Sequence, residues 1–212
     1  EAHIITSLEE IAWLFNLRGR DVLHTPVFYA FALVELERVR VYLLNDEKKV
    51  KSLFDDGIEI KLYTAIFDEL KTLKAKSIMY DENTISYRLF ESIPHSCRAV
   101  KCKDPAMLMK AVKNSAEIAC TKQAHIRDGA AVTRFIKWLK ANVSTDEITE
   151  ISAADYLWEE RRRQGAYDLS FDTIAGYGPH GAIVHYESTP ETDVALAPEG
   201  FLLVDSGGQY RD

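Results

Sequence analysis

The sequence predicts an α/β fold in two domains, at residues 1–103 and 104–212. Residues 4–103 alternate between short apolar runs, which are typical of strands, and segments with helical periodicity. At Asp104-Pro105 the pattern changes, because aspartate followed by proline is a strong signal for the start of a helix. Helical periodicity then dominates until strand-like runs return toward the end of the chain. With 212 residues, 47% of them hydrophobic, the chain is long enough to form one or two hydrophobic cores.

In the first domain we expect strands and helices to alternate. The strands are expected at residues 3–5, 27–36, 39–44, 58–62, 77–80 and 99–102. A first helix is expected between Ser7 and Gly19, because Ser7 and Glu10 have the spacing of a capping box and glycine often ends a helix. Further helices are expected at residues 50–54, 67–70 and 83–91.

Helices are expected to open the second domain. Asn114 and Glu117 have the spacing of a capping box, and the amphipathic pattern that follows predicts a long helix to about residue 142. Gly129 lies inside this pattern and costs about 1 kcal/mol of helix stability relative to alanine. A third helix is expected to be capped by Ser152 with Asp155 and to run to residue 164. Strands are then expected at residues 171–175, 182–186 and 200–205.

Composition excludes several classes of function. The formal net charge is −7 and there is no long basic run, so we expect no binding to nucleic acid. No apolar run reaches the length of a membrane span, and the first residues lack the pattern of a signal peptide. Because residue 1 is not methionine, a preceding leader or domain is possible. Three cysteines without metal-ligand spacing are expected to be free thiols in a reducing cytosol.

Residues 176–181, Gly-Tyr-Gly-Pro-His-Gly, formally match the dinucleotide-binding pattern G-x-G-x-x-G. That pattern needs glycines that open a helix whose N-terminus holds a pyrophosphate. Here the following residues, AIVHY, are typical of a strand, and Pro179 removes a backbone donor from the loop. We therefore expect a glycine turn between two strands and no dinucleotide site.

Two polar residues follow predicted strands and are candidate site residues. His185 comes after the apolar run 182–184 and precedes Tyr186, so an acid–base pair is possible, although a structural histidine is commoner at such a place. Asp205 ends the run 201–204 and precedes Ser-Gly-Gly, which is typical of a plain turn aspartate. A metal ligand is the alternative, but the spacing of the other residues reveals no further ligands.

Five blocks of the sequence, in this order, resemble one family. They are IAWLFNLRG (11–19), AHIRDGAAVTRFIKWL (124–139), ITEISAADYL (148–157), SFDTIAGYGPHGAIVHY (170–186) and LVDSGGQYRD (203–212). The family is the cytosolic Xaa-Pro aminopeptidases, the three-domain aminopeptidase P enzymes of metallopeptidase family M24. The resemblance implies a creatinase-like, non-catalytic middle domain followed by the first part of a pita-bread catalytic domain.

The resemblance also implies a site and a reaction. In the family a D-S-G-x-Q-Y stretch continues into G-T-T-D, and both aspartates bind two divalent metal ions, usually manganese. Asp205 matches the first aspartate and His185 matches the histidine that helps to bind and protonate the scissile Xaa-Pro bond. The implied substrates are peptides with proline in second position, and the implied protein is a cytoplasmic homodimer. The sequence departs from the family at His180, where asparagine is common, and at Ser188, where proline is common, and neither departure touches the implied ligand.

The chain is expected to be a fragment, because only one of the five family metal ligands falls within it. We expect the fragment to be inactive and poorly stable on its own. Two other functions stay open. A relative with the same fold and no metals would bind peptides without cleaving them, and a related metallopeptidase would cleave free Xaa-Pro dipeptides. The NLRG block argues against the dipeptidase through the resemblance alone.

Overall fold

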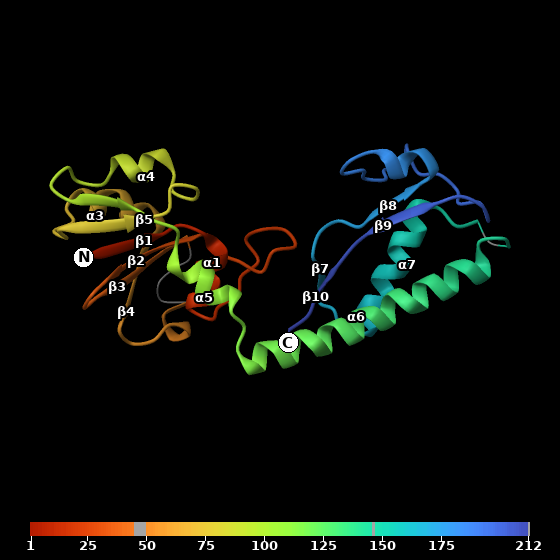
Figure 1. The fold of residues 1–212 in the computed structure, drawn as a ribbon, viewed down its shortest axis with the longest axis horizontal. Coiled ribbons are helices and arrows are strands. Elements are labelled where there is room, and N and C mark those ends of the chain that lie inside the picture. Colours follow the sequence, from red (N-terminus) through yellow and green to blue (C-terminus); the bar gives the residue numbers. More distant parts are fainter. Residues whose placement is uncertain (45–49, 146, 212) are drawn as a thin grey trace. The chain divides into compact units, whose positions relative to one another are not determined.

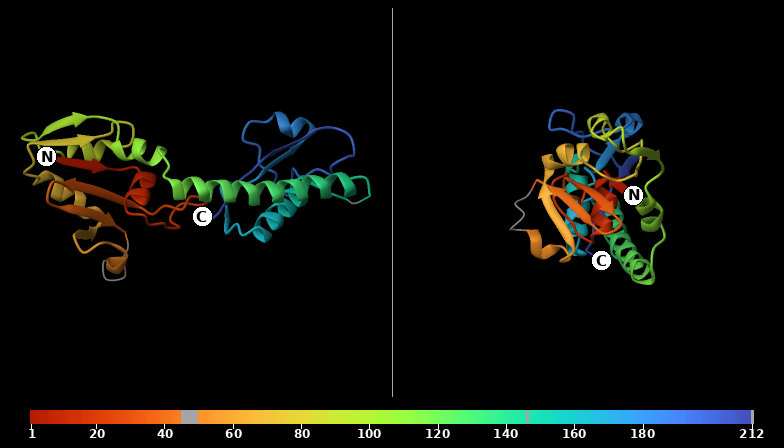
Figure 2. Two further views of the ribbon diagram at one scale, coloured as in Figure 1. Left: turned by 60° about the horizontal axis from the view of Figure 1, so that its bottom comes forward. Right: turned by 90° about the vertical axis from the view of Figure 1, so that its left-hand side faces the viewer.

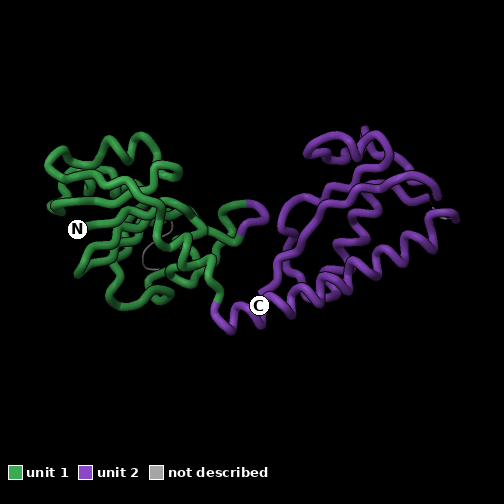
Figure 3. The backbone as a smooth tube through the Cα atoms, viewed as in Figure 1, with its two compact units in different colours: residues 1–22, 26–113 green, residues 23–25, 114–212 purple. Residues whose placement is uncertain are grey.

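The computed structural model describes residues 1–44, 50–145 and 147–211, and the chain divides into two compact units (Figure 3). Unit 1 comprises Glu1–Val22 and Pro26–Lys113, and unit 2 comprises Leu23–Thr25 and Asn114–Asp212. Helix α5, Pro105–Ala111, starts at the predicted Asp104 cap, whose side chain accepts a hydrogen bond from the Ala106 amide. This helix belongs to unit 1.

Unit 1 is built on a six-stranded mixed sheet (Figure 1). Its strands are β1 Ala2–Ile5, β2 Ala30–Glu35, β3 Val39–Leu43, β4 Ile58–Leu62, β5 Ser77–Tyr80 and β6 Arg98–Lys101. Their order in the sheet is β4-β3-β2-β1-β5-β6. The pairs β1–β2 and β2–β3 are antiparallel, and the other three pairs are parallel. All six predicted strand segments are confirmed.

Helical segments cover both faces of this sheet. They are α1 Leu8–Leu14, η1 Lys51–Leu53, η2 Tyr63–Ala65, α3 Ile66–Lys71, α4 Tyr87–Glu91 and α5. Alternate strand residues point to opposite faces: Leu33 and Tyr42 pack with residues of α3 and α4, while Ala32 and Val41 pack with residues of α1. The two clusters form the cores on either side of the sheet.

The first helix begins directly after Ser7, as predicted, but its predicted capping box and its predicted end at Gly19 are wrong. Ser7 makes no capping hydrogen bond with its side chain, because its hydroxyl is turned to the Glu9 carboxylate at 3.1 Å. The helix also ends at Leu14, before Gly19. Asn16 adopts the left-handed conformation, with φ 51°, and the Leu17 amide donates to the Ala12 carbonyl at 2.9 Å. Asparagine thus takes the place that glycine usually holds after a helix.

Unit 2 consists of two packed helices and two short antiparallel strand pairs. The helices are α6 Ser115–Asn142 and α7 Glu150–Arg163, which lie along each other (Figure 2). The strands are β7 Asp168–Leu169, β8 Ile174–Tyr177, β9 Leu202–Asp205 and β10 Gly208–Gln209, with η3, Gly178–Ala182, between β8 and β9. Strand β8 pairs with β9, and β7 with β10. The core between helices and strands contains Phe135, Ile148, Ala153, Leu157 and Leu196.

The long helix and its capping box are confirmed, but two predictions for unit 2 are wrong. The N-cap of α7 is Thr149, and Ser152 is the reciprocal partner three residues later. Residues 182–186 form no strand: η3 follows β8 directly, and Ile183 and Val184 are 53% and 82% exposed. The glycine-rich stretch therefore leads from a strand into a 3₁₀ helix and does not join two strands.

The cysteines at positions 97, 102 and 120 are free thiols. Within the described residues, no helix has the length and apolar character needed to cross a lipid bilayer.

Candidate functional site

His185 lies in the irregular segment after η3, with its side chain exposed and its backbone in the left-handed region at φ 55°. For a residue other than glycine this conformation costs about 1–2 kcal/mol. Such strain persists where the surrounding structure over-determines the backbone, and it concentrates at functional sites. The sequence predicted an ordinary strand end here, so this property of His185 emerges only from the fold.

One buried carboxylate holds the segment around His185. Glu150, the first residue of α7, is fully buried. Its Oε1 accepts a hydrogen bond from the Tyr177 amide at 2.6 Å and lies 2.9 Å from His180 Nδ1. Its Oε2 accepts hydrogen bonds from the Tyr186 hydroxyl at 2.9 Å and from the Ser188 hydroxyl at 3.1 Å.

These hydrogen bonds keep Glu150 ionised. Burial raises the pKa of its carboxyl, but the Tyr177 amide, His180 and the two hydroxyls together outweigh burial, and the pKa is lowered. A hydrogen bond to a charged group contributes about 1.5–3 kcal/mol, so the set is strong enough to offset the backbone strain at His185. Residue spacing did not reveal Glu150, because glutamate is common in the first turn of any helix.

Asp205 is the last residue of β9 and pairs with Ile174 of β8. Its side chain is exposed and has no hydrogen-bond or ion-pair partner among the described residues. A carboxylate fixed in direction by a strand and free of partners fits one ligand position for a hard divalent cation. The residues that the structure describes contain no group of three or more His, Cys, Asp or Glu side chains arranged for a metal, so they supply a single ligand.

The segment after Asp205 is attached to both helices of unit 2. The Ser206 carbonyl lies 3.4 Å from Nη2 of the buried Arg161, and the Tyr210 hydroxyl donates to Asp128 at 3.0 Å. Strand β10 then pairs with β7. These contacts fix the direction in which β9 delivers Asp205.

The structure places the segments that carry the two predicted site residues beside each other, without a direct bond between His185 and Asp205. A methyl group added at Gly181, four residues before His185, would lie 3.4 Å from Cβ of Leu203, two residues before Asp205. A methyl group added at Gly176 of β8 would lie still closer to the backbone of η3, 2.9 Å from the Gly181 amide nitrogen. The roles of His185 and Asp205 stay predictions.

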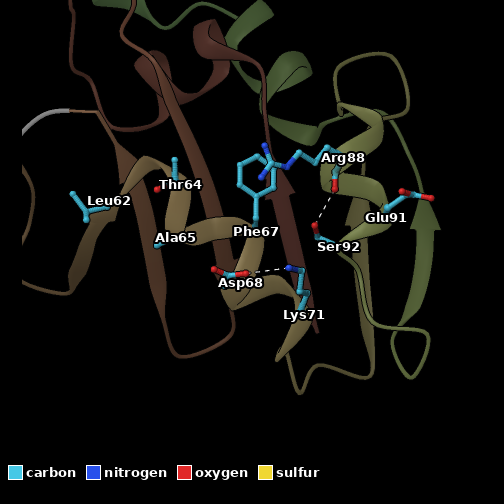
Figure 4. Close-up of a pocket in the computed structure, with 9 residues that line it drawn as sticks. All are labelled: Leu62, Thr64, Ala65, Phe67, Asp68, Lys71, Arg88, Glu91 and Ser92. Atoms are coloured by element: carbon cyan, nitrogen blue, oxygen red, sulfur yellow. Dashed lines mark hydrogen bonds and ion pairs between the residues drawn. The ribbon is translucent and has the colours of Figure 1, made fainter.

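Unit 1 contains an open pocket of about 480 Å³ between the segments around α3 and α4 (Figure 4). Its charged side chains are engaged with neighbours: Lys71 pairs with Asp68 at 3.0 Å, and the Arg88 guanidinium lies 4.1 Å from the centre of the Phe67 ring. The pocket lies in unit 1, and neither of the two predicted site residues lines it.

Comparison with known proteins defines the class of the two units. Residues 1–117 match the creatinase/prolidase N-terminal domain, and residues 119–212 match metallopeptidase family M24. The chain is 35% identical to "Aminopeptidase P2" of Arabidopsis thaliana, covering 100% of this chain and 35% of that protein. It is 39% identical to "Xaa-Pro aminopeptidase 1" of Dictyostelium discoideum, covering 99% of this chain and 34% of that protein.

Solved structures agree with these relatives. The X-prolyl aminopeptidase of Caenorhabditis elegans, described as a cytosolic enzyme with a di-nuclear active site, superposes with a TM-score of 0.91 at 28% identity. The match covers 99% of this chain and 36% of that one. The Xaa-Pro dipeptidase of Bacillus anthracis shares the fold, with a TM-score of 0.73 at 19% identity, over 99% of this chain and 56% of that chain.

The fold and the two matched families define the class: an α/β unit of the creatinase type is followed by the start of a pita-bread metallopeptidase domain. The chain belongs to the creatinase/prolidase N-terminal domain family, and the resemblance to Xaa-Pro aminopeptidases is confirmed. The chain spans about a third of the length of the curated relatives it matches.

Proposed function

We propose that the protein containing this chain is a metal-dependent aminopeptidase that hydrolyses the N-terminal Xaa-Pro bond of peptides. The observation that carries the proposal is the agreement of 99% of the chain, at a TM-score of 0.91, with an X-prolyl aminopeptidase. The curated relatives from Arabidopsis and Dictyostelium support the same activity.

In this proposal Asp205 is one ligand of a centre with two divalent ions, for which we propose manganese. The exposed, unpartnered carboxylate at the end of β9 supports this role. A dinuclear centre needs more ligands than the described residues provide. The others would come from parts of the protein that correspond to the remaining length of its relatives.

We assign His185 to the substrate. When bound, two divalent ions activate water and polarise the scissile carbonyl. The exposed imidazole of His185 would donate a hydrogen bond to the peptide at the bond being cleaved, where charge develops in the transition state. Its strained backbone supports this role, because strain is retained where geometry matters for function.

The proposal has consequences for the rest of the molecule. Unit 1 would be non-catalytic, the protein would act in the cytosol, and it would form a homodimer as the resemblance implies. The 212-residue chain alone would be inactive, since it contributes only one of the proposed ligands.

The test uses the full-length protein with and without manganese on an Xaa-Pro-Yaa peptide. We expect manganese-dependent release of the first residue. Asp205→Asn should lose both activity and manganese binding measured by calorimetry, whereas His185→Ala should lose activity and keep manganese binding. An inactive protein would overturn the proposal and favour a peptide-binding module, and cleavage of free Xaa-Pro dipeptides alone would favour a dipeptidase.

A further inference from the structure

We propose that Glu150 is a positioning residue that holds His185 in its left-handed conformation and so presents the imidazole to the substrate. This inference rests on the proposed peptidase function and adds a residue that touches no reacting atom. The carboxylate is fully buried, whereas the imidazole it would position is exposed.

The first support is where the partners of Glu150 lie along the chain. Tyr177 and His180 precede His185, and Tyr186 and Ser188 follow it. One side chain on α7 therefore fixes the irregular segment on both sides of His185. A carboxylate whose only role was to interact with the positive end of the helix dipole would not need hydrogen-bond partners on both sides of His185.

The second support is the residue next to His185. Tyr186 is buried, its hydroxyl donates to Glu150, and its ring lies 4.5 Å from the His180 ring. The Ser188 hydroxyl also reaches the Ala175 carbonyl of β8 at 3.2 Å. Because Tyr186 is anchored inward and Ser188 is attached to β8, the backbone at His185 has little freedom to leave its conformation.

The same helix offers a matched control. Glu160 is also a buried carboxylate of α7, but it pairs with Arg134 and Arg163, and neither of these lies in residues 177–188. Glu150→Gln and Glu160→Gln make the same chemical change at two buried sites of one helix. Tyr186→Phe removes a single hydrogen bond to Glu150 and serves as a milder variant if Glu150→Gln fails to fold.

The first readout does not depend on activity. In the full-length protein, hydrogen exchange by mass spectrometry should show exchange at residues 178–188 faster by about tenfold in Glu150→Gln, less so in Tyr186→Phe, and unchanged there in Glu160→Gln. Unchanged exchange of this segment in both Glu150→Gln and Tyr186→Phe would overturn the proposal. If the wild-type protein has no peptidase activity, the proposed function is overturned. The hydrogen-exchange result then still shows whether Glu150 holds the segment around His185.

The second readout is a double-mutant cycle on kcat/KM with the Xaa-Pro-Yaa peptide. We expect His185→Ala to lose on the order of 100-fold and Glu150→Gln about tenfold, with manganese binding retained. In the His185→Ala background, Glu150→Gln should cost less than about twofold, because the residue it positions is gone. An equal loss in both backgrounds would mean that Glu150 acts independently of His185 and would refute the inference. Glu160→Gln should leave kcat/KM unchanged in either background.

Discussion

Arg161 on α7 holds Asp128 on α6 through two parallel hydrogen bonds, from Nε to Oδ1 at 2.8 Å and from Nη2 to Oδ2 at 3.1 Å. Arg161 is 1% exposed, whereas the Asp128 side chain is partly exposed, at 27%. Tyr210 donates a third hydrogen bond to Asp128, and Nη2 of Arg161 also reaches the Ser206 carbonyl. The pair thus connects both helices to the segment that follows Asp205.

Asp128→Asn should destabilise the protein by about 3 kcal/mol, because it leaves the charge of Arg161 buried without its counter-ion. The measurement is the urea-unfolding midpoint of the full-length protein, followed by tryptophan fluorescence. Glu159→Gln is the control, since the Glu159–Arg162 pair on the same helix is about half exposed and should contribute less than about 0.5 kcal/mol. Equal effects of the two changes would contradict the expectation.

The same pair predicts a pH dependence. Burial raises the pKa of Asp128, but Arg161 and the Tyr210 hydroxyl outweigh burial, with a small contribution from the charge of His125, and the pKa is lowered. A lowered carboxyl pKa contributes stability above the unfolded value of about 3.9 and loses it as the pH falls through the folded value. Unfolding midpoints below about pH 4 should therefore fall less steeply with pH in Asp128→Asn than in the wild type. Identical slopes would show that Asp128 does not titrate differently in the two states.

Ser7 and Thr149 are the N-cap residues of α1 and α7, and the structure predicts different contributions to stability from their side chains. Thr149 Oγ1 accepts a hydrogen bond from the Ser152 amide at 3.2 Å, whereas Ser7 makes no capping bond with its side chain. Thr149→Ala should lower stability by about 1 kcal/mol, and Ser7→Ala by less than about 0.5 kcal/mol. Thermal unfolding of both variants checks this, and a larger loss at Ser7 would speak against the cap assignment.

Local patterns predicted much of unit 1, for a physical reason. Both faces of its sheet are buried, so successive residues of a central strand are apolar and short apolar runs mark the strands. The capping box at Asn114 and the aspartate–proline start at Asp104 are also local, and both are confirmed.

The candidate site was harder to predict, because long-range contacts create it. Residues 182–186 have the composition of a strand, yet they form none, and the Tyr186 hydroxyl donates to Glu150, more than thirty residues earlier. No local sequence pattern around Glu150 or His185 predicts that hydrogen bond. The metal-ligand role that we propose for Asp205 was suggested only by the resemblance, since a lone carboxylate before two glycines is typical of a turn.

Gly176 provides the last prediction, because the approach of η3 to β8 depends on it. A Cβ at this position would lie 2.9 Å from the Gly181 amide nitrogen and 3.0 Å from the His180 carbonyl carbon, both of them backbone atoms that must move. Gly176→Ala should therefore destabilise the protein by about 1–3 kcal/mol. Because the displaced backbone leads to His185, kcat/KM should fall in the same variant if the proposed function holds.

Gly129→Ala is the matched control for this change. Gly129 lies inside α6, and an added Cβ would meet no atom within 4 Å beyond its chain neighbours and the nearby backbone of its own helix. Alanine there should stabilise the protein by about 0.5–1 kcal/mol, because glycine loses more backbone freedom when a helix forms. A urea midpoint that falls in Gly176→Ala and rises in Gly129→Ala would show that the loss of stability comes from the lack of space beside Gly176. A Gly176→Ala protein as stable as the wild type would mean that η3 can move away from β8 without loss, and that the segment leading to His185 is less tightly fixed than its contacts indicate.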